Sequence, residues 1–191
     1  MTHSGRAQNT REALAPLEPP YAPATQKLLG SYPKREGQLL GLFRVFAHSD
    51  RFLGRVPNLL DEESPLSLCE RELVILRTTA RNRAEYEWGV HVTAFAKAAG
   101  LDDEQVMDTV NRAPSSGCWS EQALSLLAIT DELLERGRLS AARQAEFDGR
   151  WSTAQRLEIL MLIGTYSMIS YVANVADLPL EEWGARFPNN R

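Results

Sequence analysis

The stretch SLCERELVILRTTARNRAEYEWGVHVTAFAKAAG, residues 67–100, predicts two consecutive helices. Ser67 followed by Glu70 is a capping-box pattern, and it opens a helix that runs from Leu68 to Asn82. A second helix is expected from Ala84 to Ala99, ended by the glycine that follows. Apolar residues recur here at helical spacing and do not alternate, which favours an all-α fold.

The same signals continue on both sides of this stretch. No alternating strand pattern and no glycine-rich phosphate loop is found, so we predict an all-α bundle of about seven to nine helices. We expect a flexible N-terminal tail over residues 1–22 and a single all-helical domain over residues 23–191. The further helices are expected at 24–31, 38–48, from 50 to about 60, 102–112, 120–136, 140–149 and from 152 to the proline at 179.

The amino-acid composition limits the classes of function that the protein can have. The 191 residues are 43% hydrophobic and 24% charged with a net charge of −4, which argues against a general nucleic-acid or anionic-membrane binder. Residues 1–20 hold no apolar run of a secretory signal, and Cys69 and Cys118 form no CxxC motif. We therefore expect a cytoplasmic protein with free thiols.

The segment Leu157–Leu178 is long and apolar, but it includes Glu158, Asn174 and Asp177. A membrane-spanning helix tolerates few or no charges. This pattern favours a helix that is buried on most sides, for example at a subunit interface, and no membrane partner is expected.

Three polar residues form the candidate catalytic site. Glu72 lies within the apolar stripe of its helix, where a carboxylate without a partner is costly. Glu87 and His91 are four residues apart on the next helix and share a face. Histidine titrates near neutrality, and a carboxylate beside it can hold its tautomer while a second, partly desolvated carboxylate acts as acid or base. The cluster predicts proton transfer, as in enolisation, lactone opening or decarboxylation.

Each of these residues also has a structural explanation. Glu87 stands in the first turn of its helix, where the helix dipole favours acids, His91 can be a hydrogen-bonded core residue, and Glu72 can pair with an arginine. Glu-x-x-x-His can also ligate a metal, but no second such pair is present, so neither a metal nor a cofactor is expected.

Four further residues are candidates for substrate binding. Tyr86 and Trp88 flank the acidic residue of the second helix and can line a pocket, although Trp88 can equally be core. Arg77 can bind a substrate carboxylate or lie on a solvated face, and Trp119 can close over a pocket.

The chain resembles the carboxymuconolactone decarboxylase family, which includes the AhpD-like proteins. The segments that carry the resemblance are 71–77 (RELVILR), 84–88 (AEYEW), His91 and 98–101 (AAGL). The resemblance implies an AhpD-like all-helical bundle that assembles into a dimer, trimer or hexamer and takes a small-molecule substrate.

AhpD-like members use a cysteine pair with an upstream glutamate and a downstream histidine. Glu72 and His91 match the glutamate and the histidine, but Ala84 and Glu87 fall where the cysteines would be. Thiol peroxidase activity is therefore disfavoured, because peroxide reduction needs a thiolate and a resolving thiol. The resemblance then implies a cofactor-independent lyase or isomerase of aromatic catabolism acting on a small carboxylated lactone or related catabolite. A non-catalytic helical oligomer is the other alternative.

Overall fold

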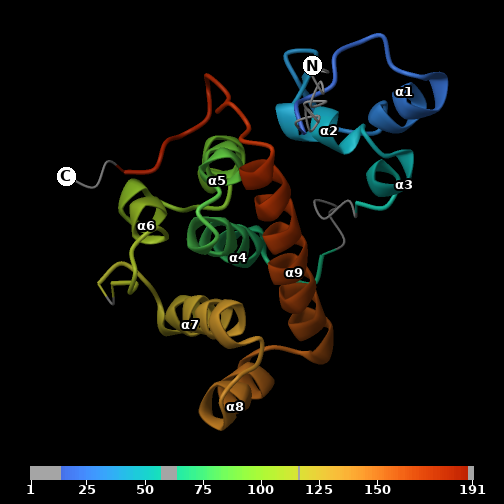
Figure 1. The fold of residues 1–191 in the computed structure, drawn as a ribbon. Coiled ribbons are helices and arrows are strands. Elements are labelled where there is room, and N and C mark those ends of the chain that lie inside the picture. Colours follow the sequence, from blue (N-terminus) through green and yellow to red (C-terminus); the bar gives the residue numbers. More distant parts are fainter. Residues whose placement is uncertain (1–13, 57–63, 116, 189–191) are drawn as a thin grey trace, which may run out of the picture.

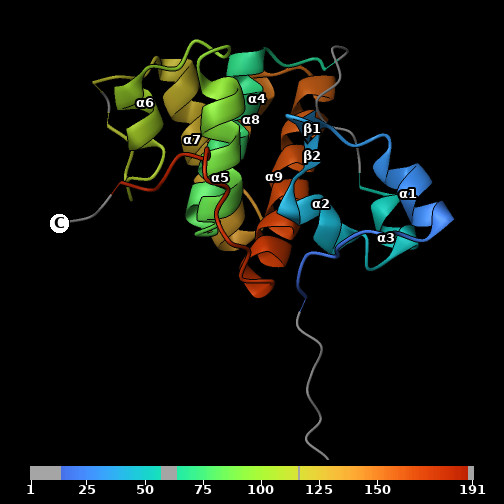
Figure 2. The same cartoon turned by 90° about the horizontal axis from the view of Figure 1, so that it is seen from above.

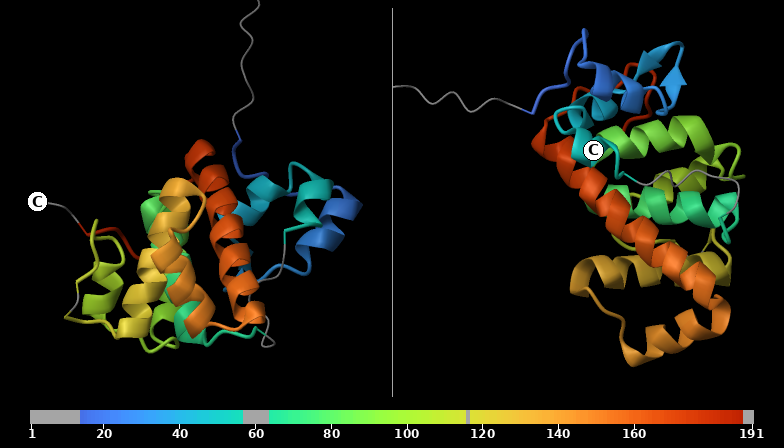
Figure 3. Two further views of the ribbon diagram at one scale, coloured as in Figure 1. Left: turned by 90° about the horizontal axis from the view of Figure 1, so that it is seen from below. Right: turned by 90° about the vertical axis from the view of Figure 1, so that its right-hand side faces the viewer.

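The computed structural model describes residues 14–56, 64–115 and 117–188. Over these ranges the fold is an all-α bundle, as predicted, with nine α-helices, one π-helix and one short hairpin. The long C-terminal helix α9 (Thr153–Val175) runs between two groups of helices, with α1–α3 on one side and α4–α8 on the other (Figures 1 and 3).

Helix α4 (Leu68–Arg81) is the centre of the larger group, and it packs against α5 (Glu85–His91), α7 (Glu121–Arg136) and α9. The predicted capping box at Ser67 and Glu70 is formed. All residues from 71 to 79 are buried, because neighbouring helices cover α4 on several sides. A polar side chain in this run is therefore held away from water, whichever face it occupies.

The remaining helices of this group follow the predicted caps. Helix α6 (Asp103–Asp108) begins at Asp102, and α8 (Ala141–Arg150) begins at Ser140. Gly137 ends α7 in a left-handed conformation with φ of 67°, which costs a glycine little.

The helix expected from Ala84 to Ala99 is not uniform. It is α-helical only as far as His91 and continues as a π-helix, η1 (Val92–Ala96). π-Helical turns insert an extra residue and often stand at functional sites. This turn begins directly after the predicted catalytic histidine, and sequence periodicity cannot resolve it.

The smaller group consists of α1 (Pro23–Leu29), α2 (Gly41–Phe46) and α3 (Asp50–Leu53), with a hairpin of β1 (Lys34–Arg35) and β2 (Gln38–Leu39). The helix predicted over 38–48 is wrong at its start, because residues 38–39 form β2. Glu36 and Gly37 have φ of 51° and 82°, as a tight hairpin turn requires. Strands of two residues are too short to show alternation, so the sequence pattern missed them.

The N-terminal residues of the described chain lie along α2. The Leu17 amide donates to the Arg44 carbonyl, and Glu18 forms an ion pair of 2.9 Å with the Arg44 side chain. Residues 1–13 of the predicted tail lie outside the described residues, and the division into tail and domain stays a prediction.

Helix α9 is the one helix of the described chain that is long and apolar enough to cross a membrane. In its most apolar stretch of 18 residues, 39% is buried inside the protein. Helix α9 packs on α4, α5 and α8, but several apolar side chains along it are exposed, so within a single chain it is partly buried, and further burial at a subunit interface stays a prediction. The exposed apolar residues are Leu157, Leu160, Met161, Tyr171 and Val175. Assembly into an oligomer and the cytoplasmic location stay predictions.

Candidate functional site

Glu72, Glu87 and His91 meet in the interior of the bundle. His91 Nδ1 lies 2.8 Å from Glu72 Oε2, and its Nε2 lies 3.5 Å from Glu87 Oε1. Glu72 comes from α4 and the other two from α5, whose close packing brings the side chains together. The imidazole is thus placed between two carboxylates in a sheltered position.

The charge on His91 follows from its neighbours. Burial favours the neutral ring, but the Glu72 carboxylate and its hydrogen bond, together with Glu87, outweigh burial and raise the pKa of His91 to about 10. At neutral pH the ring is therefore an imidazolium that donates from Nδ1 to Glu72. Its Nε2–H points toward Glu87 and holds a proton available for transfer.

In each of the two carboxylates, one oxygen is not engaged by His91. Glu72 Oε1 and Glu87 Oε2 are buried and have no hydrogen-bond partner among the described residues. A buried acceptor without a partner costs free energy, and such atoms recur at catalytic and ligand sites. In Glu87 this atom belongs to a residue that lines a cavity, so a ligand can supply the missing donor.

A cavity of about 510 Å³ extends from Glu87 and His91 toward the surface between α5 and the α1–α3 group. This volume is in the range of pockets that enclose small organic ligands. Glu72 is fully buried and is not part of the lining, so it lies behind the imidazole. The sequence placed Glu72 as the acid or base, whereas the geometry places Glu87 and His91 nearer to any ligand.

Tyr166 is a site residue that sequence reasoning missed. It comes from α9, lines the cavity, and stands edge-on to His91 with 5.0 Å between the ring centres. Burial, followed by the charges of Glu87 and Glu72, raises the pKa of Tyr166 well above its ordinary value, so the phenol stays neutral. A tyrosine within a long apolar helix gives no sequence signal that separates this role from ordinary core packing.

Arg77 does not line the cavity, contrary to its prediction as a substrate-binding residue. Its guanidinium is fully buried and pairs with Asp131 at 2.6 Å. The remaining N–H groups donate to the carbonyls of Thr109, Asn111 and Arg112. With every donor engaged, Arg77 joins α4 to α7 and to the loop after α6.

The three aromatic candidates are also directed away from the cavity lining. The Tyr86 hydroxyl donates to Glu181 at 2.6 Å, and the Trp88 ring packs on Phe187. Both contacts hold the C-terminal segment, residues 176–188, which crosses α5 (Figure 2). Trp119 is buried and donates to an aspartate of α6.

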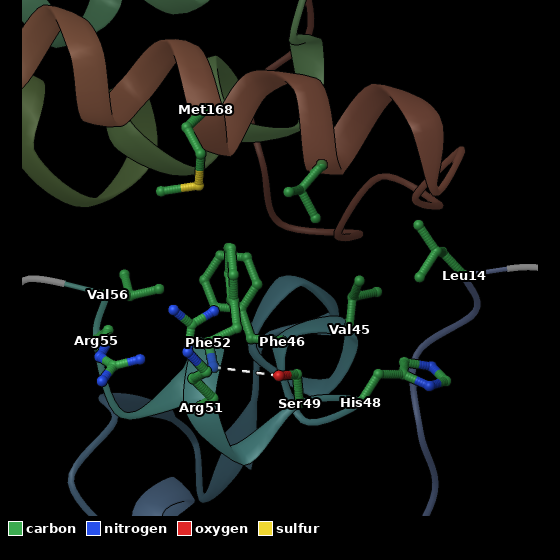
Figure 4. Close-up of a pocket in the computed structure, with 11 residues that line it drawn as sticks. Leu14, Val45, Phe46, His48, Ser49, Arg51, Phe52, Arg55, Val56 and Met168 are labelled. Atoms are coloured by element: carbon green, nitrogen blue, oxygen red, sulfur yellow. Dashed lines mark hydrogen bonds between the residues drawn. The ribbon is translucent and has the colours of Figure 1, made fainter.

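A second hollow, of about 420 Å³, lies between α9 and α2–α3 (Figure 4). Met168 of α9 faces Phe46 and Phe52 across it, while Arg51 and Arg55 stand at its edge. No carboxylate lines it among the described residues, so it offers no acid–base pair.

Neither cysteine belongs to the cavity lining. Cys69 is exposed on α4 and Cys118 is half-buried after α6. Burial raises the pKa of the Cys69 thiol, which lowers its thiolate fraction. Across the described ranges, no group of three or more histidine, cysteine, aspartate or glutamate side chains is placed to hold a metal ion.

Fold and site together define an AhpD-like helical bundle with a buried carboxylate–imidazole site. Residues 50–132 match the model of the carboxymuconolactone decarboxylase family. Residues 50–132 therefore resemble this family, in agreement with the resemblance drawn from the sequence, and the two cysteines of the chain form no CxxC pair.

A solved structure shares the fold at low sequence identity. It is an uncharacterized peroxidase-related protein from Silicibacter sp. TM1040, with a TM-score of 0.73 and 16% identity over 92% of this chain and 96% of that chain. A comparison with curated proteins finds no match.

Proposed function

We propose that the protein is a cofactor-independent lyase or isomerase that uses Glu87 and His91 for proton transfer on a small carboxylated lactone or related catabolite. The observation that carries this proposal is the series Glu72–His91–Glu87, a hydrogen bond of 2.8 Å followed by an ion pair of 3.5 Å, which ends on a cavity large enough for such a substrate. The family match supports the same class of chemistry.

Glu87 and His91 supply the two proton-transfer groups. In an isomerisation, the Glu87 carboxylate takes the proton of an acidic carbon and His91 Nε2–H delivers a proton to a second carbon. The proton on Glu87 then passes to Nε2, across the short gap between the two side chains, and both groups return to their starting states. In a decarboxylation, the C–C bonding electrons stay on carbon as CO₂ leaves, Nε2–H protonates that carbon, and water restores the imidazolium.

Glu72 is a positioning residue in this scheme. It accepts the Nδ1–H hydrogen bond at 2.8 Å, which fixes the ring orientation and favours the protonated imidazole. Tyr166 offers a neutral hydroxyl to the same cavity, where a substrate oxygen that gains negative charge would need a donor.

The experiment measures proton transfer directly. A panel of carboxylated lactones and β,γ-unsaturated acids is incubated with the protein in D₂O, and NMR follows CO₂ loss, double-bond migration and deuterium incorporation at carbon. Glu87→Gln and His91→Asn should each lower turnover by about 100-fold or more, the usual contribution of a general acid or base. Glu104→Gln is the matched control, because Glu104 is exposed on α6.

The positioning role has its own readout. Glu72→Gln should move the alkaline limb of the pH–rate profile to lower pH, because the imidazole loses the charge that raises its pKa. Circular dichroism confirms folding of every variant. Full turnover by folded Glu87→Gln and His91→Asn proteins would refute the mechanism.

A further inference from the structure

The wall of the cavity beside Glu87 and His91 is mostly apolar and rich in aromatic rings. Tyr32, Phe43 and Phe46 stand on the α1–α3 side, where Tyr32 and Phe43 pack with 4.7 Å between ring centres. Phe95 of the π-helix and Tyr166 of α9 face them from the other side. Leucine, isoleucine and valine side chains fill the remaining wall, including Leu28, Leu40, Leu42, Leu53, Val56, Val90 and Ile169.

This lining favours a ligand whose buried part, called here the ligand body, is apolar. A compact ligand with carboxylates on several sides would leave charged oxygens against hydrocarbon, and burying an unpaired charge is strongly unfavourable. An aromatic or branched aliphatic body instead gains from the removal of apolar surface from water and from ring contacts.

Positive charge gathers at the outer rim of the cavity. Lys34 and Arg35 of β1 both line it and are exposed. The Arg35 guanidinium lies over the Trp183 ring at 4.1 Å from its centre. This cation–π contact joins the hairpin to the C-terminal segment across the rim.

The C-terminal segment is itself firmly placed. The Ala185 amide donates to the Gly89 carbonyl at 3.1 Å, and Thr93 Oγ1 donates to the Trp183 carbonyl at 3.3 Å. Trp183, and with it the Arg35 side chain, is thereby held at the rim before any ligand enters.

The two ends of the cavity differ in electrostatic character. The buried end carries Glu87, the one carboxylate of the described lining, beside the His91 imidazolium, so these two opposite charges offset each other there. The exposed end presents two cations. An anionic ligand therefore enters with its charge at the hairpin and its neutral, reacting part at Glu87 and His91, an orientation that suits the isomerisation and not the loss of that same carboxylate.

We propose that the cavity binds amphipathic carboxylates, with the apolar body inside and the carboxylate at Lys34 and Arg35 of the hairpin. This inference rests on the proposed function, because it names the substrate class of the same site. It makes Lys34 and Arg35 specificity-determining residues at the end of the cavity away from Glu87 and His91.

The test compares two unreactive probes that share one apolar body. 2-Naphthoate carries the charge, and 2-naphthalenemethanol replaces it with a neutral group. Isothermal titration calorimetry at low ionic strength should show naphthoate binding about ten-fold tighter, a ratio reasonable for two exposed ion pairs. High salt should reduce this ratio, because the rim charges are exposed to solvent.

Substitutions test whether the preference for naphthoate over the neutral probe depends on Lys34 and Arg35. The double variant Lys34→Gln with Arg35→Gln should bring the ratio close to one, whereas the control Arg112→Gln with Arg138→Gln should keep it, since both control residues are exposed and outside the cavity. Ala94→Trp places a large ring in the cavity lining and should weaken both probes.

Three outcomes overturn the inference: equal affinity for the two probes, a ten-fold preference that persists in the hairpin variant, or no binding of naphthoate. Because neither probe reacts, binding is measured independently of turnover. A catalytically active protein without charge preference refutes this inference alone, and an inactive protein with the preference refutes only the proposed function.

Discussion

The stability of the fold should depend on alkaline pH through His91. Its pKa is raised from an ordinary value of 6.5 to about 10, because the charge and hydrogen bond of Glu72, with Glu87, outweigh burial. A raised folded-state pKa contributes stability that is complete below the unfolded-state pKa and is lost as pH rises through the folded-state value. The window of loss therefore runs from about pH 6.5 to about pH 10.

The size of the stability loss follows from the same difference between the folded-state and unfolded-state pKa of His91. At about 1.4 kcal/mol per pH unit, the full window corresponds to on the order of 5 kcal/mol, a large share of the stability of a typical domain. Between about pH 7 and pH 9 the free energy of unfolding should fall by about 2–3 kcal/mol. Lysine and tyrosine titrate mainly above this interval, whereas the raised pKa of the Cys69 thiol removes some stability in the same direction, so a His91 variant is needed to isolate the share of the histidine.

Urea unfolding followed by tryptophan fluorescence at pH 6, 7, 8 and 9 and constant ionic strength measures this dependence. His91→Asn keeps a donor near Glu72 but does not titrate, so its stability should fall much less than that of the wild type from pH 7 to pH 9. His48→Asn is the matched control, since His48 is exposed, and it should retain the wild-type slope. Parallel curves for wild type and His91→Asn would show that the pKa of His91 is not raised in the folded state.

Two further predictions concern residues that organise the fold around the site. Arg77→Met should lower the free energy of unfolding by about 3 kcal/mol or more, because it leaves a paired carboxylate and three carbonyls without their donor. The preference for naphthoate over the neutral probe should persist in this variant. A variant with unchanged stability in urea titration that loses this preference in calorimetry would contradict the assignment. Gly89→Ala should cost about 1–3 kcal/mol and increase proteolysis of the C-terminal segment, because an added Cβ would lie 2.1 Å from the Ala185 carbonyl oxygen. Gly164→Ala, with nothing within 4 Å of its added Cβ, should not destabilise the protein, and equal behaviour of the two glycine variants would disprove the close-contact argument.

Much of the site was predictable because its members are related by local spacing. Glu87 and His91 share a helix face by virtue of their four-residue separation, and Glu72 lies in an apolar stripe of the preceding helix. Two helices joined by a short turn must pack against each other, so their buried polar groups are brought within reach.

The binding residues could not be predicted in the same way. Arg77, Tyr86 and Trp88 are close in sequence to the catalytic residues, yet they pair with groups from α7 and the C-terminal segment. Residues at the cavity rim, by contrast, are remote in sequence from the catalytic histidine and gave no motif.

The sequence by itself determined the helical class, most helix starts and ends, and the acidic and imidazole groups of the candidate site, because caps, periodicity and i,i+4 spacing act within a few residues. Only the tertiary structure decided which side of the imidazole faces a ligand, that Tyr166 joins it, and that Lys34, Arg35 and Trp183 surround the opening. These depend on how α9, the hairpin and the C-terminal segment pack against α5, and burial and contact across long sequence separations are properties of the folded chain alone.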